Sequence, residues 1–266
     1  MNTVTSKDGT RIAFDQRGSG PPLVLVDGAL CSRKFGPMAS LAELLAPRFT
    51  VFNYDRRGRG DSGDTPPYSV ERETEDLAAL VETAGGAPFL YGSSSGAALV
   101  MRAAAGGVRA RKLVLHEPPY ALDDSASPLL GSYRARIGEL LAADRRGDAV
   151  ALFMKVVGVP AFGVFMMRLM PNIWPKMKAV ARTLPYDFAQ LGDTPGKPLS
   201  RELRDVMAAV SAPTLLVLGG KSPDWMRRAV ETVASAIPGA KQRTVPGQNH
   251  AIAAKAIAPV LVEFFA

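Results

Sequence analysis

Cysteine and histidine are both scarce in this chain of 266 residues. Cys31 is the single cysteine, which excludes an intramolecular disulfide and a zinc site built on several thiolates. The lack of a disulfide framework is typical of a reducing compartment, so we expect a cytoplasmic protein. His116 and His250 are the only histidines, which leaves few candidates for a general base at neutral pH.

Long apolar runs are also missing. The first nine residues lack the apolar centre of a signal peptide, and no stretch of about 18 apolar residues would span a bilayer. The net charge of +7 is spread over separate short groups of basic residues, which disfavours nucleic-acid binding. With 47% hydrophobic residues, the chain can bury the core of one large domain. We therefore expect a soluble globular protein without a membrane span, and the sequence leaves its oligomeric state open.

Short apolar runs alternate with amphipathic segments along most of the chain. Such runs are typical of strands that are covered on both faces in a parallel sheet. The predicted strands cover residues 11–17, 23–26, 49–54, 89–91, 113–116 and 214–218, and the predicted helices cover 38–46, 70–84, 96–105, 224–236 and 251–265. Because residues 11–17 alternate between apolar and polar, we expect an antiparallel edge strand there. The predicted fold class is α/β, a mostly parallel central sheet flanked by helices.

Residues 120–209 break this alternation. They carry helical patterns at 130–144, 149–157 and 173–183 but no strand pattern. We expect an inserted helical cap, or lid, on a core formed by residues 1–119 and 210–266. The candidate substrate-binding residues in the cap are Met154, Phe165, Met166 and Trp174. These side chains suit packing within the cap equally well; if they bind substrate, it is a small molecule with a sizeable apolar part.

A turn of small residues joins the strand predicted at 89–91 to the helix predicted at 96–105. Its sequence is Gly92-Ser93-Ser94-Ser95-Gly96, with Ser94 at the centre of a Gly-x-Ser-x-Gly pattern. In such a turn the glycines let strand and helix approach closely, and the central hydroxyl is presented as a nucleophile. The N–H of Ser95 points toward a developing oxyanion. Ser94 is therefore the candidate nucleophile, and a plain packing turn is the alternative.

A serine nucleophile needs a neighbouring base. His250 lies in a loop just before the last predicted helix and is our candidate. His116 ends an apolar strand, so we expect it to pack in or near the core.

The loop after residues 49–54 contains a competing motif, Gly58-Arg59-Gly60-Asp61-Ser62-Gly63. This matches the dinucleotide fingerprint, which must open a helix that holds a pyrophosphate. Two prolines follow instead, so we expect no nucleotide cofactor. The loop residues Asp55, Arg56, Arg57 and Asp61 are expected to form mutual ion pairs that brace it, in preference to binding an anionic substrate.

Three segments resemble the α/β-hydrolase superfamily in its expected order along nearly the whole chain. They are Tyr54–Ser62, Gly92–Gly96 and Gly247–His250. The resemblance points to the serine hydrolase branch, which includes esterases, lipases and thioesterases. Asp27-Gly28-Ala29 also resembles the oxyanion turn of the family, although Asp27 replaces the usual histidine. The implied oxyanion donors are the N–H groups of Ala29 and Ser95.

The acid that would orient His250 is ambiguous in the sequence. Most family members carry an aspartate where this chain has Ser222. Glu117 is our first candidate, because a subset of the superfamily carries its acid after the strand that corresponds to residues 113–116. Asp224 is the alternative, although it also suits the first turn of the next helix. Asp123 and Asp124 are weaker candidates.

These residues together predict acyl transfer to water. We expect Ser94 to attack an ester, thioester or lactone, with His250 as base and with no metal or organic cofactor. Two other readings stay open. One is a cofactor-free lyase or cyclase of the same fold that uses Ser94 only as a hydrogen-bond donor, and the other is a ligand-binding protein that has lost turnover.

Overall fold

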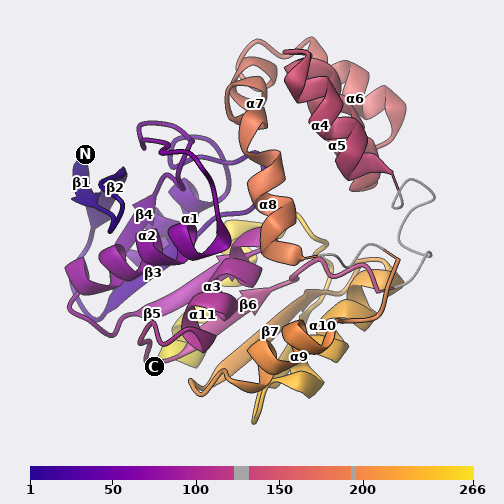
Figure 1. Ribbon diagram of the computed structural model, residues 1–266. Helices are drawn as coiled ribbons and strands as arrows, with labels where there is room; N and C mark the ends of the chain where they lie inside the picture. The colour runs from indigo at the N-terminus through magenta and orange to yellow at the C-terminus, as the bar shows by residue number, and fades with distance from the viewer. Residues whose placement is uncertain (123–131, 193–195) are drawn as a thin grey trace.

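A central twisted sheet organises the protein (Figure 1). The computed structural model describes residues 1–122, 132–192 and 196–266. Within those residues the sheet has eight strands in the order β1-β2-β4-β3-β5-β6-β7-β8. The strands are β1 (Asn2–Thr5), β2 (Arg11–Arg17), β3 (Pro22–Val26), β4 (Thr50–Tyr54), β5 (Phe89–Ser93), β6 (Leu113–His116), β7 (Thr214–Gly219) and β8 (Lys241–Val245).

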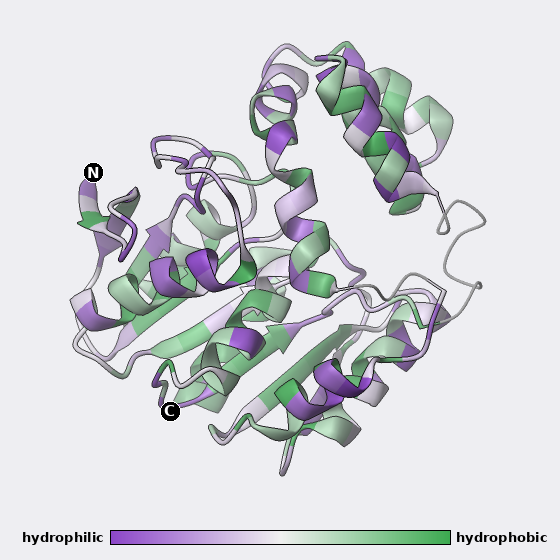
Figure 2. Cartoon of the chain, in the orientation of Figure 1, coloured by the Kyte–Doolittle hydropathy of each residue, from purple (hydrophilic) through white to green (hydrophobic). Residues whose placement is uncertain are grey.

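All neighbouring pairs from β4 to β8 are parallel, which confirms the predicted fold class. The strands β3, β6 and β7 are buried almost throughout, as their continuous apolar sequences require. Figure 2 shows this as a mostly hydrophobic colour along the middle of the sheet. The sequence therefore predicted the interior strands because burial on both faces leaves no place for alternating polar residues.

The antiparallel side of the sheet differs from the prediction in one respect. β2 is antiparallel to both of its neighbours, as expected. It is not the edge strand, however, because β1 lies outside it. β1 is only four residues long and largely exposed, so it has no apolar pattern that would reveal it in the sequence.

Two layers of helices cover the sheet and bury a separate apolar cluster on each face. One cluster contains side chains of α2, α3, α9 and α10, and the other contains side chains of α1 and α11. These helices are α1 (Met38–Leu45), α2 (Val70–Thr83), α3 (Ser95–Ala105), α9 (Arg201–Ala208), α10 (Asp224–Ala236) and α11 (Ala254–Phe265). The functional turns must then lie at the open carboxyl edge of the strands.

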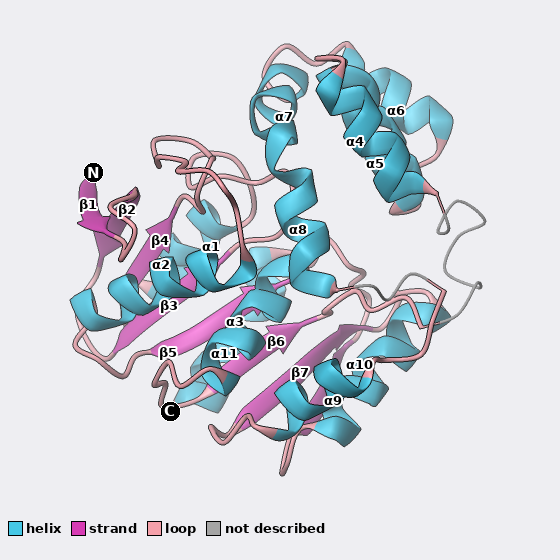
Figure 3. Ribbon diagram, viewed as in Figure 1, coloured by secondary structure: helices cyan, strands magenta, loops and turns pink. Residues whose placement is uncertain are grey.

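A separate group of helices lies above that edge (Figure 3). It comprises α4 (Tyr133–Ala142), α5 (Arg146–Val156), α6 (Ala161–Arg168), α7 (Trp174–Val180), a 3₁₀ turn (Ala181–Thr183) and α8 (Leu184–Leu191). These helices share an apolar cluster of their own, which includes Ile137, Val150 and Leu184. In contrast, Leu203 and Met207 of α9 pack in the cluster of the sheet. The predicted limits of the cap, residues 120 and 209, stay a prediction.

Candidate active site

The turn between β5 and α3 holds Ser94 in a strained conformation. Its φ of 56° and ψ of −126° lie in a region that non-glycine residues rarely adopt. A Cβ added at Gly92 would lie 2.5 Å from Gly96 O, and one added at Gly96 would lie 2.6 Å from Asp27 O. Both glycines are therefore required by the close approach of backbone segments. This sharp turn projects the Ser94 side chain from the carboxyl edge of the sheet.

A chain of hydrogen bonds connects Ser94, His250 and Glu117. The distance from Ser94 Oγ to His250 Nε2 is 3.2 Å, and that from His250 Nδ1 to Glu117 Oε2 is 2.7 Å. Ser94 follows β5 and Glu117 follows β6, so parallel pairing of these strands brings them to the same edge. His250 reaches them from the loop after β8. Three segments that are distant in sequence thus converge at one point.

Glu117 is completely buried and has a full set of partners. Its Oε1 accepts hydrogen bonds from Gly219 N and from Ser222 Oγ, each at 2.6 Å. Burial acts to raise the pKa of Glu117, but the hydrogen bonds to His250 and Ser222 outweigh it and hold the pKa below its usual value. This carboxylate is therefore ionised and able to stabilise an imidazolium.

The other acid candidates lie elsewhere. Asp224 is the exposed first residue of α10, and Pro223 is the N-cap residue of that helix. Asp123 and Asp124 lie outside the residues that the structure describes. Sequence reasoning missed the part played by Ser222, whose hydroxyl binds Glu117. The available signal was the replacement of the usual aspartate by serine at that position.

His116 is fully buried beside the His250 ring, as the sequence predicted for a core residue. Its Nδ1 is 3.2 Å from Ser93 Oγ, and the two imidazole rings are stacked with centroids 5.9 Å apart. Burial and, secondarily, the charge of His250 lower the pKa of His116 to about 4. His116 is therefore neutral at physiological pH, and its uncharged ring packs against the ring of His250.

The turn after β3 lies directly against the nucleophile. A Cβ added at Gly28 would lie 2.9 Å from Ser94 Cβ. In the described part of the chain, the N–H of Ala29 has no hydrogen-bond acceptor. The N–H of Ser95 belongs to the first turn of α3, where such groups have no acceptor within the helix. Two backbone donors thus flank Ser94.

Asp27 at this turn is buried with 4% of its surface exposed. Its Oδ1 accepts a hydrogen bond from Gly28 N at 2.8 Å, as expected for an aspartate that braces a turn. Burial raises the pKa of Asp27 to about 6, although the Gly28 hydrogen bond and the positive charge of Arg59 act against the rise.

The four predicted substrate-binding residues fall into two groups. Met154 and Trp174 pack into the apolar cluster that α4 to α8 share, where Trp174 is 9% exposed. Phe165 and Met166 on α6 are 54% and 42% exposed. Contact with substrate stays a prediction for all four.

The loop arginines do form ion pairs, but their predicted partners are wrong. Arg56 pairs with Glu73, and Arg57 pairs with Asp76, with N–O distances of 2.6 and 2.7 Å. These partners lie on α2, outside the loop. Asp55 and Asp61 pair instead with Arg33. Side chains on separate elements meet only through the tertiary fold, so the sequence could not pair them.

Within residues 1–122, 132–192 and 196–266, no group of three or more histidine, cysteine, aspartate or glutamate side chains could hold a metal ion. No helix in this part of the chain is long and apolar enough to cross a membrane.

Comparisons with known proteins agree with this architecture. Residues 18–260 match the profile of the alpha/beta hydrolase family. The crystal structure of an alpha/beta hydrolase from Sphaerobacter thermophilus is 54% identical, and the match covers 100% of both chains with a TM-score of 0.91.

Two curated proteins are similar over shorter segments. A zearalenone hydrolase from Cladophialophora bantiana is 29% identical over 154 residues, which are 54% of this chain and 57% of that protein. The uncharacterized hydrolase YraK from Bacillus subtilis is 35% identical over 95 residues, or 34% of each protein. The chain thus spans about half or less of the length of these relatives. The family profile, in contrast, matches from residue 18 to residue 260, and the chain belongs to the alpha/beta hydrolase family.

Proposed function

We propose that the protein is a serine hydrolase that cleaves a carboxylic ester, thioester or lactone with an apolar part. The observation that carries this proposal is the continuous hydrogen-bond chain from Ser94 Oγ through His250 to Glu117. A serine paired with a base, which in turn is oriented by an acid, is the arrangement that activates a hydroxyl for attack on a carbonyl.

The reaction begins when His250 Nε2 takes the proton of Ser94 Oγ as this oxygen attacks the carbonyl carbon. The carbonyl oxygen gains a negative charge, which the N–H groups of Ala29 and Ser95 stabilise. His250 then protonates the leaving alcohol, thiol or hydroxyl group as the acyl-enzyme forms. A water molecule, deprotonated by His250, releases the acid and regenerates Ser94. Glu117 stays ionised and stabilises the imidazolium.

The apolar side chains of the proposed cap favour a substrate with an apolar part. We propose that residues 120–209 act as a lid, with the exposed Phe165 and Met166 toward the substrate, while Met154 and Trp174 pack in the apolar cluster of the lid helices. The exposed rings and thioethers of α6 offer adaptable apolar surface for a ligand. Because one relative is named a zearalenone hydrolase, zearalenone belongs in the substrate panel with short and long acyl esters, thioesters and lactones.

The decisive test is Ser94→Ala. Loss of a triad nucleophile lowers kcat by about a millionfold, so we expect turnover to vanish against the panel. Ser93→Ala is the matched control, since it removes the neighbouring hydroxyl in the same turn and should keep most of the activity.

A fluorophosphonate probe separates this proposal from the two alternatives. Labelling of Ser94 together with ester turnover supports the hydrolase. Labelling without turnover favours the lyase or cyclase, and no labelling of folded protein favours a ligand-binding protein. Ser94→Ala that retained near full activity would rule out the acyl-enzyme.

A further inference from the structure

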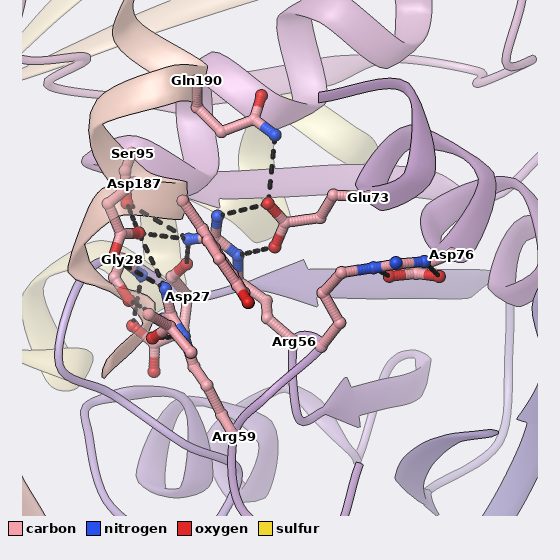
Figure 4. Close-up of polar contacts among 12 residues, drawn as sticks. Asp27, Gly28, Arg56, Arg59, Glu73, Asp76, Ser95, Asp187 and Gln190 are labelled. Atoms are coloured by element: carbon pink, nitrogen blue, oxygen red, sulfur yellow. Dashed lines mark hydrogen bonds and ion pairs between the residues drawn. The ribbon is translucent and has the colours of Figure 1, made fainter. Parts of the chain in front are cut away.

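One carboxylate from α8, Asp187, contacts Ser95 and the two loop arginines Arg56 and Arg59 (Figure 4). Its Oδ1 accepts a hydrogen bond from Ser95 Oγ at 2.6 Å. Its two oxygens also accept bonds from Arg59 Nη2 at 2.7 and 2.8 Å. A third donor is Arg56 Nη1, at 2.8 Å from Oδ1. Asp187 therefore links the helix above the sheet to the first residue of α3.

Arg59 extends this link to the second donor. Its Nη1 donates a hydrogen bond to Gly28 O at 2.6 Å. Gly28 O and the N–H of Ala29 belong to the same planar trans peptide and point in opposite directions. A guanidinium that holds the carbonyl therefore fixes the direction of the Ala29 N–H as well. It also polarises the peptide, which strengthens the N–H as a donor.

The surroundings of this group are dry. Arg56, Arg59, Asp187 and Ser95 have at most 2% of their surface exposed. Together with Glu73, the two arginines and Asp187 carry two positive and two negative charges, so the cluster is balanced. Buried ion pairs contribute little net stability compared with well-packed apolar side chains. Stability alone is therefore a weak reason for placing four charges here.

We propose that Asp187 and Arg59 are positioning residues that hold the N–H groups of Ala29 and Ser95 in place for the oxyanion. Asp187 acts on Ser95 through the Ser95 hydroxyl, and it acts on Ala29 through Arg59 and the carbonyl of Gly28. This inference rests on the proposed serine hydrolase function, because it assigns a support to the oxyanion donors of that reaction.

The test compares three variants on one ester substrate. Asp187→Asn removes the shared charge. Arg59→Met combined with Asp187→Leu removes both charges and leaves the Arg56–Glu73 pair balanced, so this variant is expected to fold even if Asp187→Asn does not. Asp76→Asn is the matched control, since Asp76 is an equally buried partner of Arg57 that does not contact the oxyanion turn.

We expect the two Asp187 variants to lower kcat by about tenfold to a hundredfold, which is less than the loss of an oxyanion donor itself. KM should stay within about twofold, because the support acts on charge that develops only in the transition state. A trifluoromethyl ketone, which forms a hemiketal oxyanion with Ser94, should bind more weakly by the same factor as kcat. Asp76→Asn should lower the melting temperature while leaving kcat of the folded enzyme unchanged.

Three results would overturn the inference. Unchanged kcat and unchanged ketone binding in the folded double variant, with Ser94→Ala inactive, would refute the positioning role alone. Equal losses of kcat in Asp76→Asn and Asp187→Asn would mean that Asp187 affects turnover only through the stability of the fold. Full activity of Ser94→Ala would instead refute the acyl-enzyme and this inference with it.

Discussion

At the scale of single residues, Asp27 is the clearest departure from the family pattern. Its carboxylate stands where the family usually has a histidine, at the turn that we propose to bind the oxyanion, and in the described structure its Oδ2 is buried without a hydrogen-bond partner. Burial raises the pKa of Asp27 from its usual value of 3.8 to about 6. Because the native state favours the protonated form, the contribution of Asp27 to stability is fully present below pH 3.8 and is lost as the pH rises through 6.

This sign predicts the behaviour of Asp27→Asn. The asparagine is neutral at every pH and can still accept the bond from Gly28 N. We expect the variant to be more stable than the wild type by about 1–3 kcal/mol at pH 7.5, with the gain disappearing near pH 4. Chemical denaturation at both pH values measures it. An equal gain at the two values would mean that ionisation of Asp27 is not the cause.

The acid partner of His250 gives a second prediction at this scale. Glu117→Gln removes the charge that stabilises the imidazolium but keeps the shape of the side chain. We expect kcat to fall by about 10³–10⁴-fold, as in other triads that lose their acid. Asp224→Asn is the matched control and should keep kcat near the wild-type value. A large loss confined to Asp224→Asn would reverse the assignment.

At the scale of elements, the junction of β5 and α3 depends on glycine because backbones meet there. Gly96→Ala would force a Cβ against the carbonyl oxygens of Val26 and Asp27. We expect this overlap to destabilise the protein by about 1–3 kcal/mol, and the shift of β3 against α3 should also lower kcat. Thermal unfolding and turnover measure the two effects.

Gly138 in α4 is the matched control for that substitution. An added Cβ at Gly138 meets no atom beyond the backbone of its own helix within 4 Å, and the residue lies inside a helix. Gly138→Ala should therefore stabilise the protein by about 0.5–1 kcal/mol through helix propensity. Similar destabilisation by both alanines would contradict the close-approach explanation for Gly96.

Elements also differ in how visible they are in the sequence. The strand Leu113–His116 and the helix Asp224–Ala236 have the limits that were predicted. The strand is a continuous buried apolar run, and the helix buries apolar residues at helical spacing on one face. The helix α8 was missed, since it is eight residues long, contains a proline in its first turn and follows another helix without a break. Short helices of this kind are defined by their packing rather than by their own periodicity.

At the scale of the whole molecule, buried charges connect α8, in the group of helices above the sheet, to the sheet layer. Glu73 of α2 accepts bonds from Arg56 and from Gln190 of α8, and Tyr68 stacks on Tyr186 with centroids 3.8 Å apart. Burial acts to raise the pKa of Glu73, but the Arg56 guanidinium outweighs it and lowers the pKa to about 2. The two layers therefore share a charged contact that requires ionised Glu73.

Acid should weaken this contact. Because the pKa of Glu73 falls from 4.5 to about 2 on folding, its contribution is present above pH 4.5 and is lost as the pH falls through 2. We expect Glu73→Gln to destabilise the protein by about 3–5 kcal/mol at pH 7 and by much less near pH 2. Unfolding curves of the wild type and the variant between pH 2 and pH 7 measure this difference in stability. A difference that does not depend on pH would contradict the role of ionised Glu73.

The sequence by itself determined the interior parallel strands, the turn around Ser94 and the choice of His250 over His116. Each follows from a local requirement: double burial imposes apolar runs, a sharp turn imposes glycine, and two histidines leave one in a loop. Only the tertiary structure decided that Glu117 hydrogen-bonds His250, that Ser222 supports Glu117, and that Asp187 meets Arg59. These contacts join residues far apart in the chain, and hydrogen bonds between distant side chains leave no periodic trace in a single sequence.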